Sequence, residues 1–351
     1  MVKFNRLESL NGIDRAPGRF LHHSHQGNRY KLFVPGGYNP NQPAPLVVML
    51  HGCTQDADDF AAGTKMNELA EDQNFFVLYP EQSFTANSNK CWNWFYWSHQ
   101  ERGKGEPAVI AGMVNEVKSH YSIDDNRVFI AGLSAGGAMS VIMAVAYPDL
   151  FSAVGVSAGL EYKAARSVWR AYAAMENGGP NPVRQGMLAY EKMGQNAAVM
   201  PIIVFHGTND QTVALKNANQ LITQWSITND LAKNGKVTGW INDQPDETVD
   251  GHVPSGRKYK HHKYQNADGK ILMEKIVVEG MEHAWSGGSP EGSYTDSQGP
   301  DASRIMWEFF MEQTNDATET EQHVSVPQRD SWWKRLCDFF LKMITNSERK
   351  N

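Results

Sequence analysis

The chain has 351 residues and 41% hydrophobic content, so it is long enough to bury a large core. Its net charge of −6, with no basic stripe, argues against a nucleic-acid partner. No apolar run reaches the roughly 18 residues that span a bilayer, and three cysteines are too few for a disulfide scaffold.

Strands and helices alternate along the first half of the chain. Residues 19–24 and 30–34 predict an antiparallel hairpin, and residues 46–50 predict a buried strand. The next predicted elements are a helix over 57–73, a strand over 75–79, a helix over 107–120, a strand over 127–131, a helix over 135–147 and a strand over 151–156. This alternation predicts an α/β fold, with a mostly parallel sheet that helices cover on both faces.

The first nine residues lack the apolar segment of a signal peptide. Three explanations stay open: a cytoplasmic protein, export by a route that needs no such signal, or a trimmed sequence.

Residues 51–55 (His-Gly-Cys-Thr-Gln) follow the strand 46–50, at the sheet edge where ligands bind in α/β folds. Gly52 permits a close turn. The backbone N–H of Cys53 is therefore the first candidate for a donor to a developing oxyanion, and that of Thr54 is the second. His51 is predicted to shape this loop and not to act as a base. A metal role is disfavoured, because no second ligand stands at zinc-like spacing.

A dense aromatic cluster occupies residues 92–97 (Trp-Asn-Trp-Phe-Tyr-Trp). Large rings can line an apolar cleft and leave an indole N–H for a polar contact. We expect Trp92, together with the distant Trp285, to line the substrate cleft. The alternative is that most of these rings belong to the core, which is the commoner fate of aromatic side chains.

Residues 132–136 (Gly-Leu-Ser-Ala-Gly) join the strand 127–131 to the helix 135–147. In a Gly-x-Ser-x-Gly turn the glycines let the backbone turn sharply from strand to helix, and the serine projects above the sheet. Ser134 is therefore the predicted nucleophile, with the backbone N–H of Ala135 as an oxyanion donor. The alternative is a tightly packed turn without a catalytic role.

Residues 161–200 interrupt the alternation with two helical stretches around residues 178–182 (Gly-Gly-Pro-Asn-Pro). We expect them to form a small cap over the cleft. The alternative is a surface segment that does not cover the cleft.

An apolar run at 201–205 predicts another buried strand, and Asp210 follows it in a short loop before a helix over 213–233. Asp210 is the predicted acid that orients the catalytic base; the alternative is a loop or helix-capping aspartate. Asp243, Asp246 and Asp250 are rivals, but they lie in a polar stretch with no strand directly before them.

His283 follows a predicted strand pair near 257–278. Ser134, Asp210 and His283 therefore occur along the chain in the order serine, acid, histidine, which is the order in α/β-hydrolases. His283 would take the proton of Ser134 and return it to the leaving alcohol, while Asp210 would fix the histidine tautomer. A surface or core histidine is the alternative.

A helix over 301–312 is predicted to close a catalytic domain of residues 1–312. The polar stretch 313–330 predicts a flexible linker, and 331–351 predicts an amphipathic helix with an apolar face. Three roles stay open for this helix: docking back on the domain, contact of residues 331–344 with a membrane or granule surface, or binding of a partner.

Five segments together resemble one known family: residues 51–55, 91–95, 132–137, 206–210 and 283–288. They are similar, in the same order, to the esterase/poly(3-hydroxybutyrate) depolymerase family, which includes related feruloyl and acetylxylan esterases. The resemblance covers about residues 20–312. It implies an α/β-hydrolase fold and a carboxylic-ester hydrolase with Ser134, Asp210 and His283 as its catalytic triad.

The resemblance also implies a disulfide between Cys53 and Cys91, which would brace the two loops; two free thiols are the alternative in a reducing cytosol. Two features depart from the family. Glu282 stands where relatives often have glycine, and the chain shows no export signal although many members are exported.

The sequence therefore predicts a carboxylic-ester hydrolase that acts through an acyl-enzyme, without a cofactor or metal, on 3-hydroxybutyrate oligomers or polymer. A feruloyl or acetylxylan esterase is the alternative substrate class. An acyltransferase and a non-catalytic binding protein on a hydrolase scaffold are the alternative kinds of function. The expected partner is a small or polymeric ester, the expected location is extracellular with cytoplasmic as the alternative, and the oligomeric state is not predicted.

Overall fold

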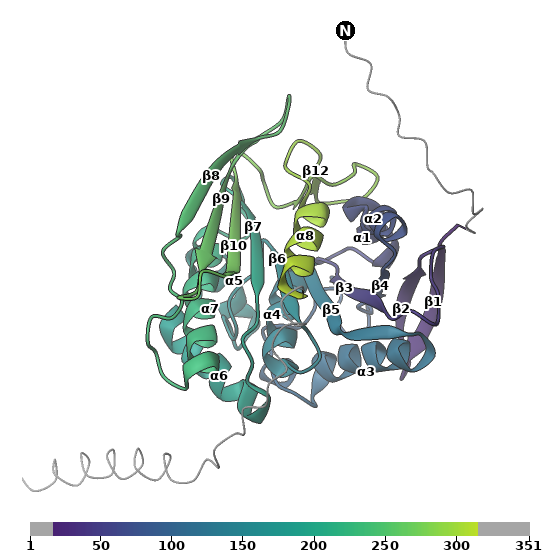
Figure 1. The fold of residues 1–351 in the computed structure, drawn as a ribbon, viewed down its shortest axis with the longest axis horizontal. Helices are drawn as coiled ribbons and strands as arrows, with labels where there is room; N and C mark the ends of the chain where they lie inside the picture. Colours follow the sequence, from purple (N-terminus) through teal and green to yellow (C-terminus); the bar gives the residue numbers. More distant parts are fainter. Residues whose placement is uncertain (1–16, 315–351) are drawn as a thin grey trace, which may run out of the picture. The chain divides into compact units, whose positions relative to one another are not determined.

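A ten-stranded sheet with helices on both faces organises residues 17–314, the part of the chain that the computed structural model describes (Figure 1). The strand order is β1-β2-β4-β3-β5-β6-β7-β10-β9-β8. The strands are β1 (Arg19–His25), β2 (Asn28–Val34), β3 (Ala44–Leu50), β4 (Phe76–Pro80), β5 (Ile123–Leu133), β6 (Ala153–Ser157), β7 (Ile202–Gly207), β8 (Glu247–His252), β9 (Lys258–Gln265) and β10 (Ile271–Val278), with β11 (Trp285–Ser286) and β12 (Thr295–Asp296) as a separate pair. The helices are α1 (Ala57–Thr64), α2 (Met66–Gln73), η1 (Trp97–His99), α3 (Gly105–His120), α4 (Ala135–Ala146), α5 (Val168–Asn177), α6 (Pro182–Met193), η2 (Gly194–Asn196), α7 (Lys216–Asn234) and α8 (Ala302–Thr314).

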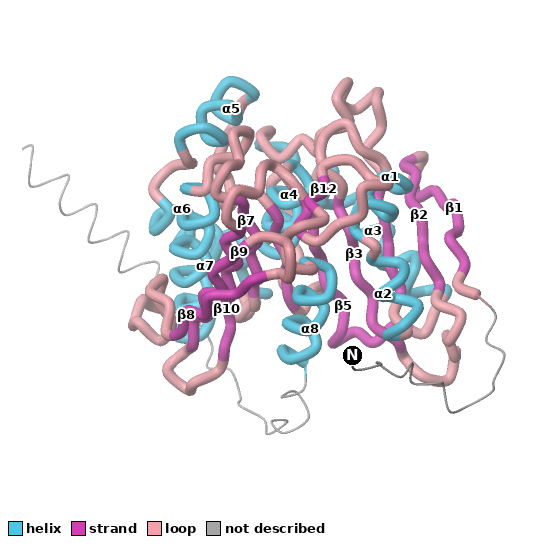
Figure 2. The backbone as a smooth tube through the Cα atoms, turned by 90° about the horizontal axis from the view of Figure 1, so that it is seen from above, coloured by secondary structure: helices cyan, strands magenta, loops and turns pink. Residues whose placement is uncertain are grey.

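The centre of this sheet is parallel, as the alternating pattern predicts. Neighbouring strands from β4 through β3, β5, β6 and β7 to β10 run in one direction. The antiparallel pairs lie outside them, at β1, β2, β8 and β9. The carboxyl ends of β3, β5 and β7 consequently share one edge, where Figure 2 shows loops and α5. The predicted α/β fold is confirmed.

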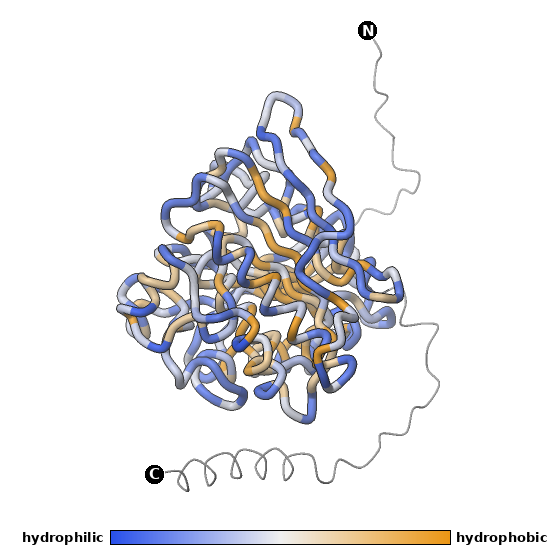
Figure 3. The backbone as a smooth tube through the Cα atoms, turned by 90° about the vertical axis from the view of Figure 1, so that its left-hand side faces the viewer, coloured by the Kyte–Doolittle hydropathy of each residue, from blue (hydrophilic) through white to orange (hydrophobic). Residues whose placement is uncertain are grey.

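Alternating strand residues supply the two faces of the sheet with separate apolar layers. In β3, Leu46, Val48 and Leu50 face the layer that also includes α3, α4 and α7, whereas Val47 and Met49 face the layer with α1, α2 and α8. Burial on both faces explains why the central strands are continuous hydrophobic runs. Figure 3 shows these hydrophobic segments gathered in the middle and hydrophilic turns around them.

Two elements differ from the prediction. The helix expected over 57–73 is two helices, because Lys65 adopts a left-handed conformation (φ 55°) and the Gly63 carbonyl accepts a hydrogen bond from the Ser289 N–H (2.8 Å) rather than continuing the helix. The strand β8 was not predicted. Its side chains are mostly exposed and polar, and it pairs only with β9 at the margin of the sheet.

The segment 161–200, expected to form a cap, is divided between two positions. Helix α6 packs so closely along α7 that a Cβ at Gly186 would lie 2.5 Å from the Gln224 carbonyl oxygen, so α6 belongs to a layer that covers the sheet. Helix α5 lies at the carboxyl edge (Figure 2), where the Ala214 N–H donates to the Met175 carbonyl (2.8 Å). Helix α6 is therefore not part of a cap, and a cap formed by α5 stays a prediction.

A buried carboxyl group lies beneath the turn that joins α5 to α6. Glu161 is only 3% exposed, and a Cβ at Gly179 would lie 2.5 Å from its Oε1. Neither of its carboxyl oxygens has a hydrogen-bond partner in the described part of the chain. Burial raises the pKa of Glu161 to about 8.

We expect this carboxyl to make the protein less stable as the pH rises from 5 to 8. The folded state keeps the Glu161 proton over this interval while the unfolded state loses it, so stability falls by as much as about 3 kcal/mol and is flat above the folded-state pKa. The measurement is urea unfolding of the wild type and Glu161→Gln at both pH values. Between pH 5 and pH 8 the wild type should lose more free energy of unfolding than Glu161→Gln does. The control Glu176→Gln, at an exposed glutamate, should lose as much as the wild type. An equal loss for Glu161→Gln and the wild type would contradict the prediction.

None of the described helices has the length and apolar character needed to cross a bilayer. Helix α8 extends to Thr314, two residues past its predicted end. Residues 315–330 of the predicted linker and the amphipathic helix predicted over 331–351 lie outside the described residues.

Candidate active site

Ser134 occupies a sharp turn between β5 and α4. Its backbone has φ 58° and ψ −118°, and its N–H donates to the Ser157 carbonyl (2.9 Å). A Cβ at Gly136 would lie 2.0 Å from the Leu50 carbonyl oxygen, and one at Gly132 would lie 2.5 Å from the backbone of Gly136. The two glycines of the motif are therefore required by the close approach of β3, β5 and α4.

Asp210 and His283 form a hydrogen-bonded pair. Asp210 Oδ2 lies 2.8 Å from His283 Nδ1, and Asp210 Oδ1 accepts the N–H groups of Thr212 (2.9 Å) and Val213 (2.8 Å). Burial alone would raise the pKa of Asp210, but its bonds to His283 and to the Val213 N–H outweigh burial and hold the pKa below its usual value. The carboxylate is thus ionised and fixed in orientation.

The loops that carry this pair are joined by their backbones. The Asn209 N–H donates to the Met281 carbonyl (3.0 Å), and the Gly280 N–H donates to Thr208 Oγ1 (2.8 Å). A Cβ at Gly207 would lie 2.1 Å from the Met281 carbonyl oxygen. Glycine at position 207 therefore allows the acid loop and the histidine loop to touch.

Ser157 connects Ser134 to the histidine loop. Its carbonyl accepts the Ser134 N–H, and its Oγ lies 3.5 Å from the carbonyl oxygen of Ala284, the residue after His283. The Ser134 hydroxyl and the His283 ring are not hydrogen-bonded to each other in this structure. Such bonds are often long in unliganded enzymes and shorten when the substrate binds.

The backbone N–H groups of Cys53 and Ala135, the two predicted oxyanion donors, have no hydrogen-bond partner within residues 17–314. Residues 51–55 lie against the nucleophile, since a Cβ at Gly52 would be 3.6 Å from the Cβ of Ser134. The Gly52 N–H itself is taken by Gln55 Oε1 (2.8 Å). The N–H groups of Cys53 and Ala135 are therefore free to donate, and their role as oxyanion donors stays a prediction.

His51 is part of the support of this loop. Its Nε2 accepts the Gln82 N–H (3.1 Å), so its Nδ1 carries the proton and donates to the Gly52 carbonyl (2.7 Å). Burial lowers the pKa of His51 to about 4, which keeps the ring neutral.

The prediction that Trp92 and Trp285 line the cleft is wrong. Trp92 is 3% exposed and donates its indole N–H to the His51 carbonyl, while Trp285 is 1% exposed, bonds Ser303 Oγ and packs on Phe60. Both indoles therefore support loops from within the core.

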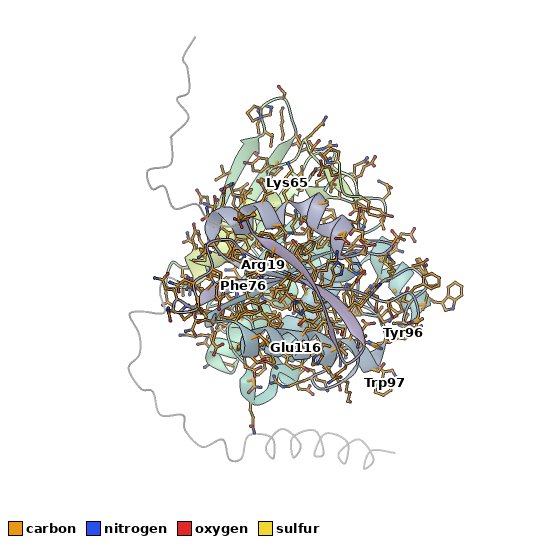
Figure 4. The ribbon with its side chains drawn as sticks, turned by 90° about the vertical axis from the view of Figure 1, so that its right-hand side faces the viewer. Arg19, Lys65, Phe76, Tyr96, Trp97 and Glu116 are labelled. Atoms are coloured by element: carbon orange, nitrogen blue, oxygen red, sulfur yellow. A yellow bond between two sulfur atoms is a disulfide. The ribbon has the colours of Figure 1, made fainter. Side chains whose placement is uncertain are left out.

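The exposed aromatic residues of the segment 92–97 are Tyr96 and Trp97. Figure 4 shows them close together at one end of the molecule.

Cys53 and Cys91 form a disulfide, at a sequence separation of 38. It ties the 51–55 loop to the segment after β4, which is also held by a hydrogen bond from the Thr54 N–H to the Asn89 carbonyl (2.6 Å). Cys53, whose N–H is a predicted oxyanion donor, is therefore held by its own disulfide and by the hydrogen bond of the next residue, Thr54.

Removing this disulfide with Cys53→Ala and Cys91→Ala should lower the free energy of unfolding by about 3–4 kcal/mol, because a loop of this length is released in the unfolded chain. Urea unfolding of the double variant beside the oxidised wild type measures the loss. Dithiothreitol should destabilise the wild type but not the double variant. Equal unfolding midpoints for wild type and double variant would contradict the expectation.

The role of His206 was not predicted, although this residue begins the 206–210 segment that resembles the family. His206 is fully buried, its Nε2 lies 2.7 Å from the Val213 carbonyl oxygen, and Asp210 Oδ2 is 3.5 Å away. Burial lowers the pKa of His206, so the ring stays neutral and donates to Val213. It packs behind Asp210 and helps to position the acid loop.

Glu282 is exposed, so its charge is solvated rather than buried beside His283. Within residues 17–314, no three His, Cys, Asp or Glu side chains are grouped so that they could hold a metal ion.

The chain is similar to known proteins in both sequence and fold. The family described as esterase PHB depolymerase matches residues 28–239, which include Ser134 and Asp210. The chain belongs to this family. Poly(3-hydroxyalkanoate) depolymerase C of Paucimonas lemoignei is 37% identical over 252 residues, covering 71% of this chain and 56% of that protein. A probable acetylxylan esterase A of Neosartorya fischeri is 32% identical over 189 residues, covering 52% of this chain and 50% of that protein.

This member of the esterase PHB depolymerase family spans about half the length of those curated relatives. Among solved structures, an acetyl xylan esterase from Aspergillus awamori superimposes with a TM-score of 0.65 at 21% identity, covering 84% of this chain and 100% of that one. A feruloyl esterase module from Clostridium thermocellum gives a TM-score of 0.53 at 14% identity, covering 90% and 94%. These likenesses establish the α/β-hydrolase fold.

Proposed function

We propose that this protein hydrolyses carboxylic esters through an acyl-enzyme formed on Ser134. The observation that carries the proposal is the 2.8 Å hydrogen bond between Asp210 and His283, at the sheet edge where Ser134 occupies its strained turn. Nucleophile, base and orienting acid are the three parts that this chemistry requires.

In the proposed reaction, His283 takes the proton of the Ser134 hydroxyl as its oxygen attacks the ester carbonyl. The N–H groups of Cys53 and Ala135 donate to the oxyanion that forms. The C–O bond to the alcohol then breaks, and His283 gives the proton to the leaving oxygen. Water, activated by the same imidazole, releases the acid from Ser134.

We propose 3-hydroxybutyrate oligomers or polymer as the substrate, since the relative with 37% identity is a poly(3-hydroxyalkanoate) depolymerase. Acetylated xylan is the second candidate, supported by the relatives named acetylxylan esterase. Parallel assays on 3-hydroxybutyrate oligomers, acetylated xylan and feruloyl esters decide between these classes. Turnover of none of the three, with no labelling of Ser134 by a serine-directed phosphonate, would overturn the proposal.

The Cys53–Cys91 disulfide supports a location outside the reducing cytosol, because structural disulfides persist in oxidising compartments. We propose that the protein acts extracellularly or in another oxidising space. A thiol count on protein isolated from its native host tests this, and two free thiols at these positions would contradict it.

A further inference from the structure

One residue at the active site is left unused by the proposed reaction. Tyr294 lies in the loop between β11 and β12 and is 46% exposed. Its ring meets the His283 ring edge to face, with centroids 6.4 Å apart at 78°. Its hydroxyl lies 3.3 Å from Thr54 Oγ1, one residue from the oxyanion candidate Cys53.

Tyr294 thus spans the distance between the catalytic base and the oxyanion loop. We propose that Tyr294 is a specificity residue whose ring and hydroxyl form the wall against the alcohol part of the ester; this inference rests on the proposed function. The placement follows from the chemistry, because His283 delivers its proton to the leaving oxygen and the alcohol must therefore lie beside the imidazole.

The loop that carries Tyr294 is held rigidly on both sides. Ser293 hydrogen-bonds Asp59 through its N–H (2.8 Å) and accepts from Gln55 Nε2 at its carbonyl (3.0 Å). The Tyr294 carbonyl accepts the Trp285 N–H (2.7 Å). Gln55 also binds the Gly52 N–H, so one side chain positions both the oxyanion loop and the tyrosine loop.

The backbone of Tyr294 is strained, with φ 52°, a conformation that bulky residues rarely adopt. Thr54 (φ 67°) and Ser134 (φ 58°) share this property. Backbone strain of this kind is common at functional sites. At Tyr294 the surrounding hydrogen bonds sustain a conformation that keeps an aromatic ring exposed beside the base.

An apolar wall with one hydroxyl discriminates among alcohols by their size more than among acyl groups. The test uses two esters with the same acyl group, phenyl acetate and methyl acetate. Because kcat/KM reports the steps up to departure of the alcohol, Tyr294→Ala should lower it about tenfold or more for phenyl acetate. For methyl acetate it should stay within about threefold, because methanol is too small to reach the ring.

Tyr294→Phe, which keeps the ring, should retain most of the phenyl acetate activity. Val249→Ala, at an exposed apolar side chain of β8 at the margin of the sheet, is the control and should change neither ester. Equal losses on both esters for Tyr294→Ala, or no loss on either, would overturn the role of Tyr294.

A binding measurement separates this inference from the proposed function. In the Ser134→Ala background, the dissociation constant of phenyl acetate, followed by ligand-observed NMR, should rise about tenfold on adding Tyr294→Ala. If the wild type hydrolyses neither small acetate and Ser134 is not labelled by a serine-directed phosphonate, the esterase proposal fails, and the binding comparison still decides the role of Tyr294. An unchanged dissociation constant would overturn it.

Discussion

Ser134→Ala is expected to lower kcat/KM for ester hydrolysis by about 10⁴-fold or more, since removing the nucleophile of a serine hydrolase leaves only oxyanion stabilisation and binding. The fold should persist, because alanine fits the same turn and the Ser134 N–H bond to Ser157 is a backbone bond. Initial rates on the wild type's best ester, together with thermal unfolding, measure both parts of the prediction.

The matched control for this substitution is Ser152→Ala, at a serine whose Oγ donates to the Asn126 carbonyl (2.7 Å) away from the site. Its activity should equal that of the wild type within about twofold. A phosphonate probe should label the wild type and Ser152→Ala but not Ser134→Ala. Hydrolysis by Ser134→Ala at near-wild-type rate would remove Ser134 from the mechanism.

The sequence alone predicted the sheet and the positions of Ser134, Asp210 and His283 because each follows from local constraints. The central strands are buried on both faces and appear as unbroken apolar runs. The serine turn needs glycine where other backbones approach within 3 Å of a Cβ. Residues at the ends of parallel strands must then meet at a single edge of the sheet.

The errors concern loops, whose packing depends on distant partners. The burial of Trp92 and Trp285 is set by the His51 carbonyl and by Ser303, which no local pattern reveals. Lys65 breaks a helical pattern because the Gly63 carbonyl is engaged by Ser289, far along the chain. Tyr294 lies in a turn that carries no motif, and only the structure places its ring beside His283.

Asp210→Asn is expected to lower kcat by about 10³–10⁴-fold, because it changes the tautomer of His283. In the wild type, Oδ1 accepts from the Thr212 and Val213 N–H groups, and Oδ2 faces His283 Nδ1. The asparagine amide has a single oxygen, which these two N–H groups retain, so its NH₂ group points at the imidazole. Nδ1 must then accept a hydrogen bond, and the proton moves to Nε2, the nitrogen that should take the proton of Ser134.

The control for this substitution is Asp250→Asn, at a rival aspartate that is exposed and paired with Lys260 (2.7 Å). It should stay within about twofold of the wild type, because an exposed ion pair contributes little. Nitrogen-15 NMR of the His283 ring provides a readout independent of turnover: Asp210→Asn should move the proton from Nδ1 to Nε2 without unfolding the protein. A loss smaller than tenfold, with the tautomer unchanged, would mean that Asp210 does not orient the base and that its bond to His283 serves the fold alone.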